Sequence, residues 1–122
     1  MDLGYFSLSL TVKDLAASRS FYESLGFSAT GGDGSSWQIM VNGGTVIGLF
    51  SGMFDRNMLT FTPGIDPTKG MVDFTDVRVL RQQMLDAGLE LQQDTTQDSP
   101  EGPASFIVLD PDGNPILVDQ HR

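Results

Sequence analysis

The sequence predicts an α+β fold made of two copies of one β-α-β-β-β module, about residues 5–51 and 58–120. Three observations predict it. Polar and apolar residues alternate near the start of each half, which is typical of a half-buried strand. Each alternating segment is followed by a helix pattern, and both helices run from an aspartate to a glycine 12 residues later. Hairpin signals follow in each half. At 122 residues the chain is long enough for one domain, 1–122, with a real core.

The first module begins with a strand over residues 5–12. Its apolar side chains, Phe6, Leu8, Leu10 and Val12, alternate with Ser7, Ser9 and Thr11. Asp14 is a good N-cap, and Gly26 is a stop signal, so a helix is expected between them. Its expected apolar stripe is Leu15, Phe21, Tyr22 and Leu25. Strands are expected over 27–30, 37–41 and 45–50. The first two are separated by a turn at 31–34, and the last two are joined by an Asn42-Gly43 hairpin.

The second module begins with an alternating strand over 58–62, which Pro63-Gly64 ends. A loop is expected up to about residue 73, although the sequence leaves the exact placement of this strand and of the 63–75 loop open. Asp76 begins the second helix, which carries Val77, Leu80 and Met84 on one face and ends at Gly88. Strands are expected over 89–92, 104–109 and 115–119. A polar loop fills 93–103, and a turn over 110–113 joins the last two strands.

The composition excludes several classes of protein. Seven Lys and Arg against 16 Asp and Glu give a net charge of −9, which argues against binding nucleic acid or an anionic membrane surface. The absence of cysteine excludes disulfides, thiol catalysis and thiolate metal sites. No apolar run approaches the ~20 residues of a membrane span. The N-terminus lacks the pattern of a signal peptide, so a cytoplasmic protein is expected.

Side chains that usually carry chemistry are scarce. The one histidine is His121, and the glutamates are Glu23, Glu90 and Glu101. General bases and metal ligands are mostly drawn from these residue types. His121, with Asp119 beside it, is the only candidate base at neutral pH, and no Ser/His/Asp triad can be assembled. We therefore assign no catalytic residue.

Two motifs resemble those of the vicinal oxygen chelate superfamily, which includes glyoxalase I, the bleomycin-resistance proteins and the extradiol dioxygenases. The first runs from Leu10-Thr-Val-Lys-Asp-Leu15 to Phe21-Tyr-Glu-Ser-Leu-Gly-Phe27, and the second is Asp110-Pro-Asp-Gly-Asn-Pro-Ile-Leu117. The resemblance covers nearly the whole chain. It implies two modules whose strands form an open, curled mixed sheet around a ligand cavity. It also implies a homodimer.

Metal-dependent members of this superfamily hold one divalent ion through His or Glu on the first and last strands of each module. Matching the motifs residue by residue gives Ser7, Gly48 or Ile47, Met58 or Lys69, and Leu117 at those positions. Apart from the weak Ser7 hydroxyl, none of these is a normal ligand for a divalent ion. We therefore expect no metal and no cofactor, and the metal-free resistance proteins are the closer analogue.

The function expected from this resemblance is metal-independent binding of a small aromatic or cationic compound in the cavity between the sheets. The residues expected to line it are Ser7, Ser9, Trp37, Gly48, Phe50, Met58, Thr60, Leu117 and Asp119. Gly48 is expected to leave room where relatives place a glutamate, and Asp119 to favour a cation. Two alternatives stay open. One is a glyoxalase-like lyase or isomerase with an atypical site, so whether the protein is an enzyme is undecided. The other is a non-catalytic scaffold or regulatory subunit with a filled cavity.

Overall fold

The computed structural model describes all residues, 1–122. The chain divides into two compact units. We call Ser7–Met58 the N-unit, and Met1–Phe6 together with Leu59–Arg122 the C-unit. Each unit contains one helix, and neither helix is long and apolar enough to cross a bilayer.

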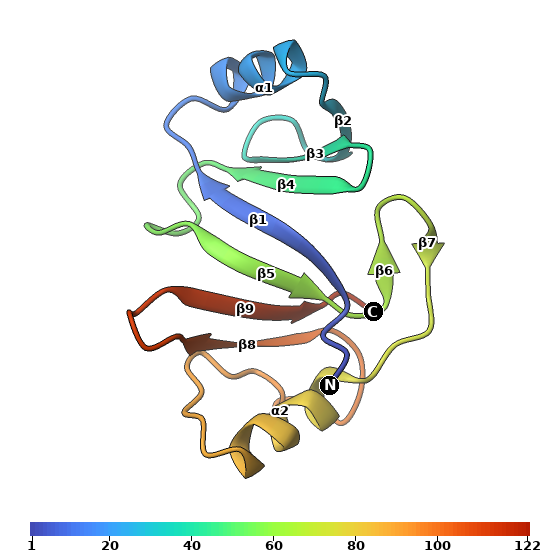
Figure 1. Ribbon diagram of the computed structural model, residues 1–122, viewed down its shortest axis with the longest axis vertical. Coiled ribbons are helices and arrows are strands. Elements are labelled where there is room, and N and C mark those ends of the chain that lie inside the picture. Colours follow the sequence, from blue (N-terminus) through green and yellow to red (C-terminus); the bar gives the residue numbers. More distant parts are fainter. The chain divides into compact units, whose positions relative to one another are not determined.

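The N-unit is a helix packed on a mixed sheet (Figure 1). Its strand order is β2-β3-β4-β1. β1 lies parallel to β4, while β3 lies antiparallel to both β2 and β4. The elements, in chain order, are β1 (Tyr5–Thr11), α1 (Leu15–Ser24), β2 (Ser28–Gly32), β3 (Trp37–Asn42) and β4 (Thr45–Phe50). The expected strand at 27–30 thus begins one residue later and continues through Gly32, with a register shift between Ala29 and Gly32.

Helix α1 begins as predicted, because the Asp14 carboxylate accepts a hydrogen bond from the Ala17 N–H at 3.1 Å. It covers the face of the sheet that carries the buried Met40, Ile47 and Leu49, and its own Leu15 completes this core. The predicted apolar stripe is wrong in part, since Phe21 and Leu25 are 60% and 56% exposed. With 3.6 residues per turn, Phe21 lies about 120° around the helix from Leu15. Tyr22 lies on nearly the same side as Leu15 and packs against the core.

The C-unit contains a second helix and a second set of strands. The strand order is β5-β9-β8, with β5 parallel to β9 and β9 antiparallel to β8. The pairing of β1, β4 and β3 is therefore repeated by β5, β9 and β8. The elements are β5 (Met58–Thr62), β6 (Ile65–Asp66), β7 (Gly70–Met71), α2 (Val77–Asp86), β8 (Ala104–Leu109) and β9 (Pro115–Gln120).

Two expectations for this half are wrong. The strand expected at 89–92 is reduced to a single bridge between Gln92 and Ile107. The chain turns away immediately afterwards, because Gln93 adopts a positive φ of 48°. The segment expected to be only loop contains the β6–β7 hairpin. The Asp66 carboxylate forms this turn by accepting hydrogen bonds from the N–H groups of Thr68 and Lys69 at 2.7 and 3.2 Å.

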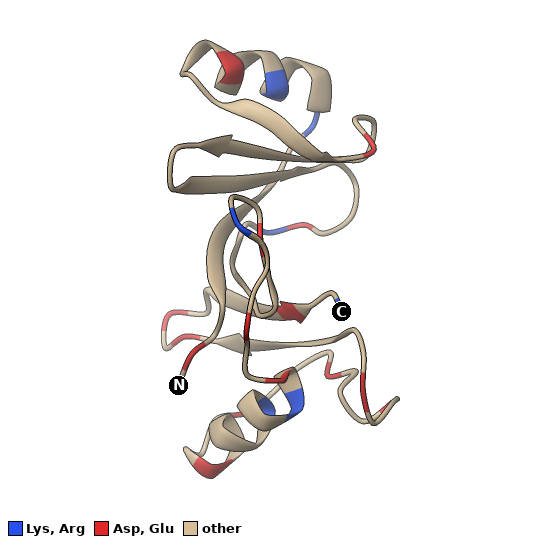
Figure 2. Cartoon of the chain, turned by 90° about the vertical axis from the view of Figure 1, so that its right-hand side faces the viewer, with Lys and Arg blue, Asp and Glu red and all other residues tan.

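Helix α2 packs on its sheet through the face that the sequence predicts. Val77, Leu80 and Met84 are buried against Ala104, Phe106, Val108 and Val118. Sixteen Asp and Glu residues, against seven Lys and Arg, are spread over both helices, the loops and the strands (Figure 2). Neither helix has an acidic residue in its first turn, so the N-caps Asp14 and Asp76 provide the negative charge there.

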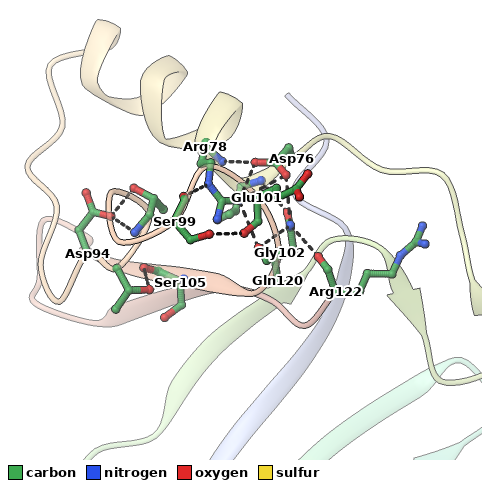
Figure 3. Close-up of polar contacts among 12 residues, drawn as sticks. Asp76, Arg78, Asp94, Ser99, Glu101, Gly102, Ser105, Gln120 and Arg122 are labelled. Carbon is green, nitrogen blue, oxygen red and sulfur yellow. Dashed lines mark hydrogen bonds and ion pairs between the residues drawn. The ribbon is translucent and has the colours of Figure 1, made fainter.

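The start of α2 is joined to the last strand by a buried polar network (Figure 3). Gln120 is 1% exposed, and its Oε1 accepts a hydrogen bond from the Val77 N–H at 2.7 Å. Its Nε2 donates to Asp76 Oδ2 and to the carbonyl oxygens of Gly102 and Arg122, at 3.1, 3.1 and 2.8 Å. The side-chain amide of one residue therefore holds β9, the N-cap of α2 and the 93–103 loop in place.

Candidate functional site

Two rows of residues lie across the N-unit sheet on the face opposite α1. Ser9, Gly48 and Ile39 are direct register partners, and so are Thr11, Phe50 and Trp37. Direct partners in a sheet project to the same side, and alternate residues project to opposite sides. The neighbouring positions Leu8, Leu10, Met40, Ile47 and Leu49 contribute to the core beneath α1. We call the other side, with Ser7, Ser9, Trp37, Ile39, Gly48 and Phe50, the open face.

The open face combines buried hydroxyl groups with half-buried rings. Ser7 and Ser9 are 5% and 3% exposed, so their side of β1 is buried. The alternation of polar and apolar residues in the sequence does not show whether the polar side is buried or in contact with solvent. Trp37 and Phe50 are half-buried. A mostly apolar wall with a few polar groups is typical of a small-molecule site.

Three rings form a continuous aromatic surface at one end of this face. The rings of Trp37 and Phe50 are parallel, with centroids 6.4 Å apart and an interplanar angle of 7°. Phe54 continues the series, with its centroid 5.2 Å from that of Phe50 and a tilt of 50°. We call Trp37, Phe50 and Phe54 the aromatic ladder. The sequence analysis missed Phe54, because it lies in an irregular segment where no periodicity indicates its direction.

The room expected at Gly48 is occupied. A Cβ atom at this position would lie 2.5 Å from Cε2 and 3.1 Å from Cζ of Phe50. The Phe50 ring therefore lies over the glycine, two residues away on the same side of β4. The expectation that Gly48 leaves space for a ligand group or a water is wrong for this reason.

The start of β3 is fixed by Asp33. Its Oδ1 accepts hydrogen bonds from the N–H groups of Ser35, Ser36 and Trp37 at 2.9, 2.7 and 3.0 Å. Its Oδ2 accepts a hydrogen bond from the Ser36 hydroxyl. The Ser36 hydroxyl and these N–H groups hold the pKa of Asp33 far below its usual value. The turn thus positions Trp37 at the end of the ladder.

The expected site residues of the C-unit also share one side of their sheet. Thr60, Leu117 and Ile107 are register partners, and Asp119 pairs with Ser105. Thr60 is buried, while Leu117 and Asp119 are partly exposed. Met58 is 8% exposed at the start of β5 and is counted with the N-unit. The structure therefore groups Ser7, Ser9, Trp37, Gly48 and Phe50 in one unit and Thr60, Leu117 and Asp119 in the other.

His121, the one histidine, pairs with Asp119, the neighbour that the sequence places beside it. Nε2 of His121 lies 2.9 Å from Oδ2 of Asp119. The hydrogen bond with Asp119 raises the pKa of His121, although burial opposes the rise.

Burial raises the pKa of the Tyr5 phenol. A hydrogen bond with Thr62 opposes this rise, and the carboxylates of Asp119 and Asp66 add to it. Tyr5 was missed, although it alternates in step with Ser7 and Ser9 and the same periodicity indicates it.

The residues present do not fit a divalent metal ion. No group of three or more His, Asp and Glu side chains that could hold one is found in the structure. The matched positions carry a hydroxyl at Ser7, a hydrogen at Gly48, a thioether at Met58 and an aliphatic chain at Leu117. We therefore derive no chemical step through a metal.

Comparison with known proteins identifies the fold but not a close relative. No protein-family model and no curated protein matches the chain. Among solved structures, a protein described as an NAD-dependent benzaldehyde dehydrogenase from Legionella pneumophila has a TM-score of 0.71 and 18% identity, covering 96% of this chain and 99% of that one. A glyoxalase/bleomycin resistance protein/dioxygenase superfamily member from Vibrio splendidus 12B01 has a TM-score of 0.62 and 17% identity, covering 94% and 97%.

A longer protein also contains this arrangement. The Mn(II)-bound glyoxalase from Novosphingobium aromaticivorans has a TM-score of 0.52 and 21% identity, and the match covers 95% of this chain and 37% of that one. The similarities are in structure, and the activities named belong to those proteins. From its strand pairings, its two helices and these neighbours, the chain has the glyoxalase/bleomycin resistance/dioxygenase fold that its motifs predict.

Proposed function

We propose that the protein is a metal-independent small-molecule-binding protein that holds a small aromatic compound against the aromatic ladder of its N-unit. The observation that carries the proposal is the parallel pair of rings at Trp37 and Phe50, half-buried beside hydroxyl groups on the open face. Flat ligands gain both apolar burial and ring contact on such a surface. Ring contact of this kind contributes roughly 0.5–1.5 kcal/mol beyond area burial.

The residue types at the family's metal positions support the metal-independent part of the proposal. Ser7 and Ser9 supply donors and acceptors that can orient a ligand without a metal. Ser9 also takes part in an interaction within the chain, so a ligand would bind beside a residue that already has a partner. The neighbours' fold is compatible with binding or with catalysis, because function depends on the site rather than on the fold.

Nuclear magnetic resonance tests the proposal directly, because Trp37 is the only tryptophan and gives one indole N–H signal. The labelled full chain is titrated with 2-naphthol and with its saturated analogue decahydro-2-naphthol. We expect saturable shifts of the Trp37 indole and of the Gly48 and Phe50 amides with 2-naphthol. The saturated analogue should bind more weakly. Absence of saturable shifts at these positions would refute the proposed site.

Matched variants separate the ladder from general hydrophobicity. Phe50→Leu removes one ring of the ladder, whereas Phe21→Leu removes a ring that is 60% exposed on α1. We expect roughly a two- to twelvefold loss of affinity for 2-naphthol in Phe50→Leu, from the ring contact of about 0.5–1.5 kcal/mol. Phe21→Leu should leave the affinity unchanged. Equal losses in both variants would show that the ladder is not the site.

A second function, a non-catalytic scaffold with a filled face, is favoured by one observation. The Phe50 ring already covers Gly48, so the position carries no open space for a ligand group. A scaffold predicts that Phe50→Leu lowers thermal stability and that 2-naphthol leaves the Trp37 signal unmoved. The same titration therefore distinguishes the two functions.

A further inference from the structure

A cavity of about 320 Å³ lies within the C-unit, between the N-terminal segment and residues 64–75, which are distant from it in sequence. The segment before β1 contributes Asp2, Gly4 and Tyr5, and the β6–β7 hairpin region contributes Gly64, Asp66 and Lys69. The link from β7 to α2 contributes Val72, Asp73, Phe74 and Thr75. Its volume is at the lower end of the range for small-molecule sites, which is about 300–1,000 Å³. None of these residues belongs to the open face.

Two glycines that line this cavity have positive φ angles and lie too close to their neighbours to carry a side chain without strain. Gly4 has a φ of +90°, and a Cβ atom there would lie 2.5 Å from the backbone of Pro63. Gly64 has a φ of +100°, and its Cβ would lie 3.3 Å from the Phe74 ring and 3.1 Å from Nε of Arg122. Side chains at these positions would be strained and would displace the wall.

Arg122 holds the Phe74 side of the cavity in place. The Arg122 guanidinium carbon lies 4.6 Å from the centroid of the Phe74 ring, and Nη2 donates to the Val72 carbonyl at 2.9 Å. The hairpin is closed on the same side, where the Val72 N–H donates to the Gly64 carbonyl at 3.1 Å. Phe74 already accepts one cation against its ring, and the Tyr5 ring also lines the cavity. Aromatic rings attract cations through the negative charge of their faces.

The charges of the lining are predominantly negative. Three carboxylates, Asp2, Asp66 and Asp73, and one ammonium group, Lys69, line the cavity, and the Arg122 guanidinium lies behind it against the Phe74 ring. Asp66 already accepts hydrogen bonds from Thr68 and Lys69 within its own turn. These hydrogen bonds, together with the charge of Lys69, lower its pKa. Asp2 accepts a hydrogen bond from the Gly4 N–H at 3.0 Å, and no cation is paired with it. Asp73 is exposed and makes no hydrogen bond or ion pair within the chain.

From this lining we propose that the cavity binds a small organic cation with an apolar or aromatic body, with Asp73 as its counter-ion. The two aromatic side chains and Val72 would contact the body, and the carboxylates would exclude anions. The cavity size limits the ligand to a small molecule, and the aromatic walls and the excess negative charge favour a cation. The burial of Tyr5 and its nearby carboxylates favour the neutral phenol, so this wall adds no negative charge at neutral pH.

Benzyltrimethylammonium is a suitable probe, compared with neutral benzyl alcohol and anionic phenylmethanesulfonate. The labelled full chain is titrated with each at low salt, and the amide signals of residues 64–75 are followed. We expect saturable shifts there with the cation, with a dissociation constant on the order of 1 mM or lower. Benzyl alcohol should bind at least several-fold more weakly, and the sulfonate should not bind.

Two variants with the same change in net charge test the role of Asp73. Asp73→Asn should weaken binding of the cation roughly two- to fivefold, the effect of one exposed charge partner. Asp112→Asn, in the exposed β8–β9 turn, should leave it unchanged. No shifts at residues 64–75, equal binding of benzyl alcohol, or equal loss in both variants would each overturn the proposal. The 2-naphthol site is read at Trp37, so the two proposals can fail separately.

Discussion

The indole of Trp37 and the phenyl ring of Phe50 lie parallel on neighbouring strands, with an interplanar angle of 7°. The two residues are register partners of β3 and β4, so the sheet itself sets their spacing. Phe50 reaches back over Gly48, which has no side chain to obstruct it. The geometry of the aromatic ladder therefore depends on a glycine as well as on the rings.

Replacing Gly48 by alanine should disturb this arrangement. The new methyl group would lie 2.5 Å from Phe50 Cε2, so the ring must move away from its position beside Trp37. We expect a loss of about 1–2 kcal/mol in the free energy of unfolding, typical of mild overpacking, and a shift of the Trp37 fluorescence maximum. Gly44→Ala is the control, because nothing lies within 4 Å of a Cβ there. An unchanged Trp37 spectrum in Gly48→Ala would contradict the geometry.

The Gln120 network predicts a large loss of stability when its polar atoms are removed. Gln120→Met keeps the approximate size of the side chain but leaves the buried Val77 N–H without its acceptor. We expect destabilisation of about 2–4 kcal/mol, since one unsatisfied buried polar group costs about 1–3 kcal/mol and several bonds are lost here. Urea unfolding measures it. Gln83→Met, at an exposed position of α2, should change stability little, and a similar loss there would argue against the network.

The single histidine allows its titration to be followed without assignment. Because Asp119 raises the pKa of His121, Asp119→Asn should lower this pKa towards its ordinary value of about 6.5. The pair contributes stability that is fully present below the unfolded pKa and is lost as the pH rises through the raised folded pKa. Proton resonances of the imidazole ring measure the shift. Asp112→Asn serves as the charge-matched control, and an equal shift in both variants would exclude a specific pair.

Asp33 should contribute to resistance against acid. Because its folded pKa is depressed, its contribution is present above the unfolded pKa and is lost as the pH falls through the folded value. Asp33→Ala should therefore raise the midpoint pH of acid unfolding, while Asp55→Ala, at another exposed loop position, should not. Circular dichroism against pH follows both. Identical midpoints for Asp33→Ala and the parent chain would show that the turn contributes nothing.

The sequence predicts the elements whose local signals agree with their packing. Both helices begin at the predicted aspartates, and the α2 face of Val77, Leu80 and Met84 is buried as expected. The strand expected at 89–92 does not form, because the pattern of four residues beside a polar loop does not determine whether another strand pairs with them. Only Gln92 finds a partner, in Ile107. The β6–β7 hairpin is missed because its turn depends on side-chain hydrogen bonds of Asp66 rather than on hydrophobic periodicity.

The site is predicted in part for a related reason. Alternation places Ser7, Ser9, Gly48 and Phe50 on one side of the sheet, as the register of β1 and β4 shows. The direction of the Phe50 ring depends on its rotamer, and no sequence pattern determines that. The superposition of residues 5–51 on 58–120 stays a prediction, as does the homodimer.

The central claim is that a small aromatic compound binds without a metal. Its most direct test is the dissociation constant of 2-naphthol, measured at the Trp37 indole signal after dialysis against EDTA and again with added Zn²⁺, Ni²⁺, Mn²⁺ or Fe²⁺. The account predicts saturable binding after EDTA treatment, with the same dissociation constant in every sample. Binding that is lost with EDTA and restored by one of these ions would contradict it, as would the absence of binding in all samples.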